Sequence, residues 1–83
     1  MRPPKGMRDY MSAAMEIYRA QRGMSQELMA ESVGISTRAY ADIARRISAP
    51  SAYTMVRYLL LLPHDDVMRI LCDLQDICDA ADI

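Results

Sequence analysis

The chain has 83 residues and a mass of 9.4 kDa, and 52% of its residues are hydrophobic although it contains neither Trp nor Phe. This length predicts one domain with a small core, in which eight Met and five Tyr supply the bulk that larger aromatic residues usually give. The net charge of −1 argues against a protein that binds nucleic acid non-specifically through a large basic excess.

Residues 1–6 are expected to form a flexible basic arm, because two prolines and a glycine disfavour local structure; such an arm can touch phosphate. The remaining residues, 7–83, are expected to form a single domain. Apolar residues recur at spacings of three and four between Met11 and Tyr18, which predicts a helix over 9–22 that Gly23 ends.

The segment 25–46 organises the domain and reads as a helix, a tight turn and a second helix. Ser25 can cap the first helix, Gly34 can adopt the left-handed conformation of the turn, and Ser36 can cap the second helix. Apolar residues of the second helix recur at core spacing, which leaves the other face exposed. The outward residues, a candidate reading surface, are Thr37, Arg38, Ala41, Asp42 and Arg45.

A further helix is predicted after Pro50, with Ser51 as its cap. Its expected buried stripe consists of Ala52, Met55, Tyr58, Leu59 and Leu62. Other apolar residues lie off this stripe, which in so small a domain predicts a second contact surface, either the final helix or another subunit. The residues assigned to a dimer interface are Tyr53, Val56, Leu60, Leu61, Ile70 and Ile77.

Pro63 separates this helix from a final amphipathic helix expected over 65–82, with Asp65 or Asp66 at its start, where a carboxylate is favourable. Its expected apolar face consists of Val67, Leu71, Leu74, Cys78 and Ala81, widened by Ile70 and Ile77.

Membrane and catalytic roles have little support. The apolar run 59–62 is far shorter than the roughly 20 residues that cross a bilayer, and residues 2–5 do not resemble a signal peptide, so we expect a cytoplasmic protein. Cys72 and Cys78 would lie roughly 9 Å apart along one helix, too far for a disulfide. With His64 as the single histidine and no nucleophile beside a base, we expect no enzyme, metal, cofactor or small-molecule substrate.

Small and capping residues recur in a fixed order between residues 11 and 62, namely Arg19, Gly23, Ser25, Gln26, Glu27, Ala30, Gly34, Ile35, Ser36, Ile43, Pro50 and Ser51. In this order and spacing the chain resembles the phage Cro/repressor helix-turn-helix family, also called the Xre family. The resemblance implies an all-α fold, a compact five-helix lambda-repressor-like bundle with a central helix-turn-helix, and DNA as the partner.

The same resemblance implies that Gln26 contacts a phosphate and that the helix 36–46 enters the major groove. Thr37, Arg38 and Asp42 then occupy base-reading positions. Arg38 can donate two hydrogen bonds to guanine, while Asp42 can accept from cytosine or pair with a nearby arginine. The DNA-contacting set is therefore Gln26, Ser36, Thr37, Arg38 and Asp42, with Arg45 and Arg46 on phosphates.

Two positions depart from the family pattern. Many members pair the first-helix arginine with an acidic residue at the end of the recognition helix and place glycine two positions later, but here these positions hold Ala44 and Arg46. Arg19 must therefore find another carboxylate, such as Glu31 or Asp42, or reach solvent or phosphate. Without the glycine, the helix is expected to run on by a turn or to end with a strained residue.

Two functions follow from these observations. A dimeric, sequence-specific transcriptional regulator that binds double-stranded DNA is favoured by the motif and by the charge distribution, +3 over residues 1–46 and −4 over residues 47–83. A protein-interaction module of the same fold, such as an antirepressor or an antitoxin-like subunit, is favoured by the pI of 5.7 and by the two departures. A monomer whose last helix only covers the core is a third possibility.

Overall fold

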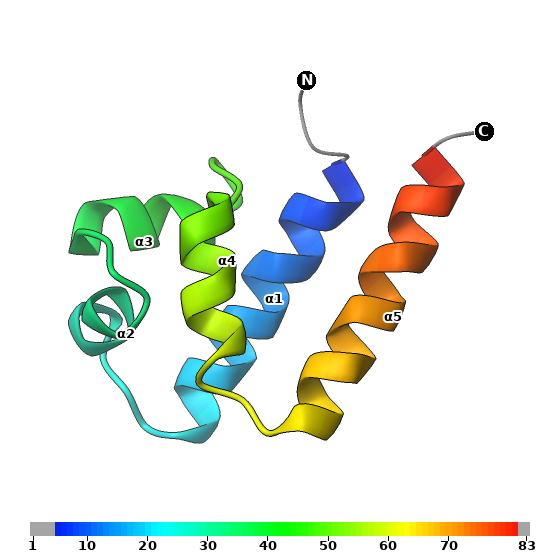
Figure 1. The fold of residues 1–83 in the computed structure, drawn as a ribbon. Coiled ribbons are helices and arrows are strands. Elements are labelled where there is room, and N and C mark those ends of the chain that lie inside the picture. Colours follow the sequence, from blue (N-terminus) through cyan, green and yellow to red (C-terminus); the bar gives the residue numbers. More distant parts are fainter. Residues whose placement is uncertain (1–4, 82–83) are drawn as a thin grey trace.

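The computed structural model describes residues 5–81, which form five helices in the order α1 Lys5–Gln21, α2 Gln26–Ser32, α3 Thr37–Ala44, α4 Ala52–Leu59 and α5 His64–Ala81 (Figure 1). α1 and α5 lie side by side and run in opposite directions, whereas α3 packs on another side of α1 and contacts α2 (Figure 1). The predicted all-α architecture, a five-helix bundle with a helix-turn-helix at its centre, is confirmed.

The three serines predicted to cap helices all do so. The Oγ atoms of Ser25, Ser36 and Ser51 accept from the backbone N–H three residues further on, at 3.0, 3.1 and 3.2 Å. Each cap satisfies one of the amide groups that a helix start leaves without a partner, and loss of such a cap typically costs about 1 kcal/mol. The starts of α2, α3 and α4 are therefore specified locally.

Glycines end α1 and α2 as predicted. Gly23 and Gly34 have positive φ angles of 64° and 77°. In both turns the glycine N–H donates to the carbonyl three residues back, and the next N–H donates to the carbonyl five residues back, at 3.0 to 3.2 Å. This pair of bonds closes the helix end and redirects the chain, which places α3 across α2.

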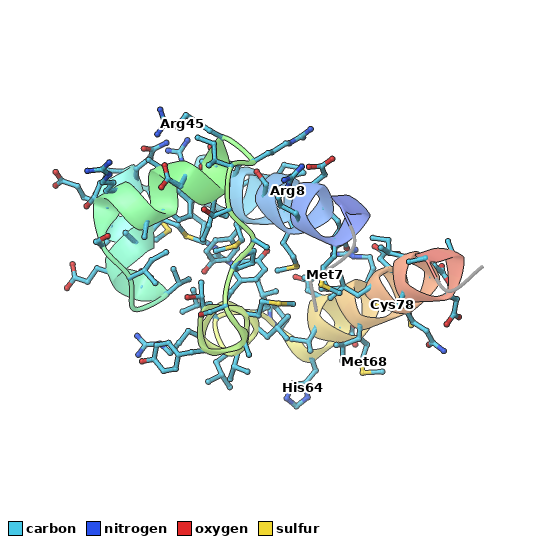
Figure 2. All side chains as sticks on the ribbon, turned by 90° about the horizontal axis from the view of Figure 1, so that it is seen from above. Met7, Arg8, Arg45, His64, Met68 and Cys78 are labelled. Carbon is cyan, nitrogen blue, oxygen red and sulfur yellow. The ribbon has the colours of Figure 1, made fainter. Side chains whose placement is uncertain are left out.

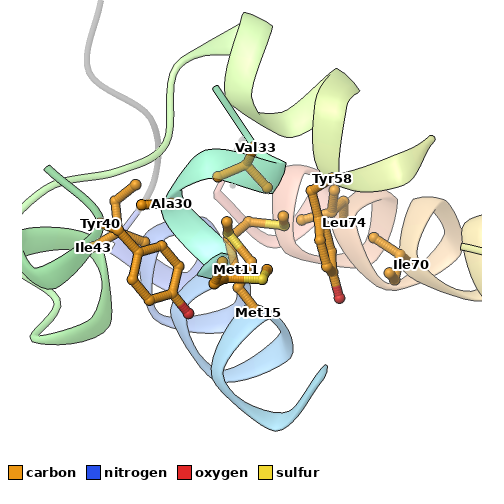
Figure 3. Close-up of a cluster of buried hydrophobic side chains, with 10 residues drawn as sticks. Met11, Met15, Ala30, Val33, Tyr40, Ile43, Tyr58, Ile70 and Leu74 are labelled. Carbon is orange, nitrogen blue, oxygen red and sulfur yellow. The ribbon is translucent and has the colours of Figure 1, made fainter. Parts of the chain in front are cut away.

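The core lies between the helices and is rich in sulfur, as the composition predicted. It consists of Met11, Met15, Met29, Ala30, Val33, Tyr40, Ile43, Tyr58, Ile70 and Leu74 (Figure 3). The hydroxyl group of Tyr58 is hydrogen-bonded inside the core, because it donates to the carbonyl of Ala14 at 3.3 Å. The Tyr58 ring packs against the ring of Tyr18 edge to face. Flexible methionines fill the irregular space that Phe or Trp would otherwise occupy.

The start of α1 differs from the prediction. Lys5 and Gly6 belong to the helix rather than to a flexible arm, whose first four residues lie outside the described part of the chain. A Cβ at Gly6 would lie 3.2 Å from Cγ2 of Ile77, so glycine allows α1 to approach α5 closely here. Nearby, the hydroxyl of Tyr10 donates to Asp73 at 2.6 Å, and burial together with this bond raises the pKa of Tyr10 to about 12. Packing against α5 therefore extends the helix beyond its apolar repeat.

The buried stripe predicted for α4 is confirmed for four of its five residues, namely Met55, Tyr58, Leu59 and Leu62, which pack in or against the core, and it differs at the fifth. Ala52 is exposed, whereas Thr54 is 1% exposed and faces the core with Tyr58. The Thr54 hydroxyl accepts from Ser51 Oγ at 3.2 Å, so the residue can be buried without leaving its oxygen unpaired. Reading only apolar residues misses a threonine buried in this way.

α5 buries a narrower face than predicted. Its core residues are Ile70 and Leu74, with Ile77 packed against them, whereas Leu71 is 45% exposed and Ala81 is exposed. The reason is that α1 alone covers most of α5, and one neighbouring helix shields only one stripe. Neither α5 nor any other helix of the described residues has the length and apolar character needed to cross a membrane.

Candidate nucleic-acid interface

α3 and its two cap residues, Ser36 and Arg45, hold five of the seven predicted DNA-contacting residues. Tyr40 and Ile43 anchor its inner face and are 0% and 4% exposed. The exposed members of the predicted set are Gln26, Ser36, Thr37, Arg38, Arg45 and Arg46. A helix of about 10–12 Å diameter fits the major groove of B-DNA, which is about 12 Å wide.

Arg38 is the charged base-reading candidate that has no partner among the described residues, in contrast to Asp42. It lies in the first turn of α3, is exposed, and forms no ion pair or side-chain hydrogen bond with the residues that the structure describes. Its neighbour Thr37 is equally exposed. A guanidinium with no internal carboxylate keeps all its donors for an external acceptor.

Asp42 has a partner within the chain. Its Oδ1 atom accepts from Nη2 of Arg45 at 3.0 Å, an ion pair between residues three apart on α3. The sequence left open whether Asp42 reads a base or pairs with an arginine, and in the free chain it pairs. The side chain of Arg45 is still 66% exposed, and surface pairs of this kind are weak enough to exchange for a phosphate.

The end of α3 is strained at Arg46, as the missing glycine predicted. Arg46 has φ 64° and is the only non-glycine residue with a positive φ in the described residues. Its N–H donates to Ile43 O at 3.0 Å, and the next N–H donates to Asp42 O at 2.9 Å, the same pattern that Gly23 and Gly34 make. An arginine therefore occupies the left-handed position that glycine normally takes, at a cost of about 1–2 kcal/mol.

Arg19 finds a carboxylate that the sequence reasoning missed. Its Nε and Nη2 atoms donate to both oxygens of Glu16 at 3.1 and 2.9 Å, and its Nη1 donates to Met24 O at 2.8 Å. The predicted alternatives, Glu31 and Asp42, are not its partners in the structure. Glu16 lies one turn earlier on α1, a spacing of three that the sequence displayed.

Glu16 also joins α1 to α3. The hydroxyl of Tyr40 donates to Glu16 Oε1 at 2.7 Å. The hydrogen bonds from Arg19, and secondarily that from Tyr40, hold the pKa of Glu16 below its usual value against the opposing effect of burial. Burial and the same bond raise the pKa of Tyr40. This network replaces the link that an acidic residue at position 44 would make and fixes α3 on α1.

α4 braces the turn between α2 and α3. The ring of Tyr53 lies over Gly34, where an added Cβ would approach Tyr53 Cε2 to 2.8 Å. Arg57 donates to the Tyr53 hydroxyl at 3.0 Å and to the carbonyl of Ser32, the last residue of α2, at 3.2 Å. Tyr53 was assigned to a dimer interface, but part of its ring packs against Gly34 of the same chain.

The comparison with protein families agrees with this geometry. A family model described as Helix-turn-helix, of the Cro/C1 type, matches residues 15–63, which is 49 of the 83 residues. The chain belongs to this family. Members are generally DNA-binding regulators rather than enzymes. Neither the curated proteins nor the solved structures contain a match to the chain.

This helix-turn-helix protein leaves an apolar surface on α4 and α5, though not with all the residues predicted for it. Ile70 is 6% exposed and Ile77 is partly buried against the core, so both offer less surface to a second copy than the prediction supposed. Exposed apolar residues on α5 take their place. The α4–α5 apolar surface consists of Val56, Leu60, Leu61, Met68 and Leu71, which are 37% to 76% exposed.

A groove of about 300 Å³ runs between α4 and α5, shares Val56 and Leu60 with this surface, and is lined by Val56, Leu59, Leu60, Leu62, His64 and Val67. In the view of Figure 2, His64 and Met68 lie at the edge of the molecule opposite to Arg45. The apolar surface and the end of the recognition helix therefore occupy different sides of the domain.

Proposed function

We propose that this chain is a dimeric transcriptional regulator that recognises a sequence in double-stranded DNA by inserting α3 into the major groove. The observation that carries the proposal is the exposed outer face of α3, on which Arg38 has no partner among residues 5–81 and Thr37 lies beside it. Membership in the family and the basic charge of residues 1–46 support the same function. Its place of action would be the cytoplasm.

Gln26, Thr37 and Arg38 have different roles in this proposal. Arg38 donates to the O6 and N7 atoms of a guanine, Thr37 contacts a thymine methyl or a phosphate, and Gln26 holds a phosphate at the start of α2. Asp42 stays with Arg45 unless a cytosine lies within its reach. This arrangement reads few bases, so a second copy is needed to reach an operator of useful length.

Selection of bound sequences from a random DNA pool tests the proposal. The wild-type chain is expected to enrich one motif, and Arg38→Ala to lose the preference at one base pair, a loss of about 5- to 150-fold for that base. Arg69→Ala is a matched control, because it removes an exposed arginine from α5 and is expected to leave the motif unchanged. No enrichment by the wild-type chain would refute sequence-specific binding.

The dimer would form through the α4–α5 apolar surface. A second copy placed there buries leucines that a monomer leaves in water and sets the half-sites about one turn of DNA apart. Leu60 is its most exposed residue at 76%, so Leu60→Lys is expected to give a monomer with unchanged helix content in sedimentation. Ile17→Lys, at a 57% exposed site on α1, is expected to remain a dimer. A wild-type monomer at micromolar concentration would contradict the dimer.

The alternative function is a protein-interaction module of the same fold. The observation in its favour is the groove between α4 and α5, whose apolar lining fits one face of an amphipathic helix. This alternative and the first proposal predict different affinities for DNA. A chain of this kind would show no affinity for DNA even at low salt, because the basic face would have no role.

A further inference from the structure

The first turns of α1 lie beside the end of the recognition helix. Ser12 is 2% exposed, and its Oγ donates to the carbonyl of Ala44, the last residue of α3, at 3.2 Å. Arg8 precedes Ser12 by four residues, and residues with this spacing share one face of a helix. Arg8 therefore extends along α1 on the face that meets the end of α3.

Arg8 and Arg45 belong to the same side of the molecule although they are 37 positions apart in the sequence. Figure 2 places both side chains on the same side of the molecule, away from His64 and Met68. Arg46 follows Arg45, is exposed, and forms no ion pair with the residues that the structure describes. Three arginines thus belong to the surface around the end of the recognition helix: Arg45 and Arg46 follow this end directly, and Arg8 lies one turn of α1 before Ser12, which contacts it.

Acidic residues do not neutralise this cluster. Asp42 pairs with Arg45 at 3.0 Å. The contact of Arg8 is weaker, because its Nε lies 3.5 Å from Oδ1 of the adjacent Asp9 with no hydrogen bond between them. The three arginines and two aspartates leave a net charge of +1, and both ion pairs lie at a surface where such pairs contribute little.

Arg8 is also poorly satisfied in the free chain. Its Nε is buried and has no hydrogen-bond partner in the described part of the chain, while the side chain as a whole is 32% exposed. A buried donor with no acceptor is unfavourable, and a structure retains few of them. Because the exposed part of the side chain belongs to atoms other than Nε, the guanidinium can still meet an acceptor from outside.

We propose that Arg8 binds a phosphate of the DNA backbone beside the groove that α3 enters, so that the first helix contributes to the DNA-binding surface. The inference rests on the DNA-binding function proposed above and deepens it. A phosphate can place its negative charge closer to the guanidinium group of Arg8 than Asp9 does at 3.5 Å. It can also accept hydrogen bonds from the guanidinium nitrogens. The contact carries no base preference, and it fixes the orientation of α3 in the groove.

The dependence of affinity on salt tests this contact. Each neutralised phosphate contributes about 0.9 to the slope of log K against log salt concentration. Arg8→Met is expected to reduce the slope by this amount. Between 50 and 200 mM salt, the fold-loss of DNA affinity is then about three times smaller for this variant than for the wild type. Arg8→Lys keeps a positive charge and is expected to retain the slope.

Arg8→Met is chosen because an apolar thioether replaces the unpaired Nε, so thermal unfolding is expected at the same temperature as in the wild type or above it. Arg8→Gln provides a second neutral variant if the first does not fold. Arg69→Met is the control for net charge. Arg69 lies on α5 and lines a groove with Tyr10 and Tyr18, away from α3, and its loss is expected to leave the slope unchanged.

The outcomes separate this inference from the function on which it rests. A wild-type chain that binds no DNA overturns both. A wild-type chain that binds DNA with the same salt slope as Arg8→Met and Arg8→Gln overturns the role of Arg8 alone. An equal reduction of the slope by Arg69→Met would also overturn it, because the effect would then come from net charge and not from a contact.

Discussion

Replacing Arg46 by glycine is expected to stabilise the domain and to weaken its binding to DNA. Arg46 occupies the left-handed region with φ 64°, where an L-residue with a side chain brings Cβ too close to a carbonyl oxygen. Glycine has no Cβ and adopts this conformation freely, and Gly23 makes the same turn at the same φ of 64°. The proposed phosphate contact of Arg46 is lost in the same step.

The size of the effect follows from two opposing terms. Relief of the left-handed strain is worth about 1–2 kcal/mol, whereas glycine loses about 0.5–1 kcal/mol more backbone entropy on folding. The midpoints of these two ranges leave a net stabilisation of about 0.75 kcal/mol, which corresponds to a rise of about 3–6 °C in the melting temperature of a domain of this size.

Thermal unfolding followed by circular dichroism measures this change, and the neighbouring arginine provides a matched control. Arg45 has φ −88°, so Arg45→Gly removes no strain and is expected to destabilise the domain by about 0.5–1 kcal/mol. The two variants have the same composition and net charge and differ only in position. A fall in melting temperature for Arg46→Gly equal to that for Arg45→Gly would refute the account of strain.

Three further predictions concern α1, α3 and the turn. Tyr40→Phe removes the bond to Glu16 and is expected to lower the free energy of unfolding by about 1.5 kcal/mol in urea titrations, as for other hydrogen bonds to charged groups; no change would exclude the link. The folded-state pKa of Glu16 lies below its usual 4.5, so the stability that the Glu16 carboxylate contributes is complete above pH 4.5 and is lost as the pH falls. The free energy of unfolding should therefore decline less in acid for Glu16→Gln than for the wild type. Parallel plots of this free energy against pH for the two proteins would contradict the prediction. Gly34→Ala should lower the melting temperature more than Gly23→Ala, because both glycines have a positive φ but only Gly34 has a ring within 4 Å of an added Cβ. Adding Tyr53→Ala to Gly34→Ala should remove part of this difference in melting temperature.

The sequence predicted the features that depend on a few neighbouring residues. The serine caps, the turns at Gly23 and Gly34 and the strain at Arg46 all follow from backbone chemistry that operates over about five residues. For this reason the boundaries of the helix-turn-helix agreed with the structure within a residue or two.

Features that depend on packing between distant segments were harder to predict. The start of α1 at Lys5 depends on contacts with α5, and the burial of Ile70 rather than Leu71 depends on which single helix covers α5. An apolar stripe with residues on several sides does not specify which side faces the core. Ile70, which was assigned to a dimer interface, is buried within the chain for this reason.

The partner of Arg19 could have been found in the sequence. Glu16 lies three residues earlier on the same helix, at a spacing that permits an ion pair. The prediction looked instead to Glu31 and Asp42, because the family pattern places the acid on another helix. The bidentate geometry and the bond from Tyr40 required the structure, since they depend on how closely α3 approaches α1.

The central claim is that α3 reads DNA sequence, and the ratio of specific to non-specific affinity tests it most directly. The wild-type chain should be titrated into a duplex carrying the selected motif and into a scrambled duplex of equal length and composition, at several salt concentrations. We predict that log K falls linearly with log salt for both and that the motif is bound at least about 10³-fold more tightly. Equal affinity for the two duplexes, or no binding at 50 mM salt, would contradict the claim.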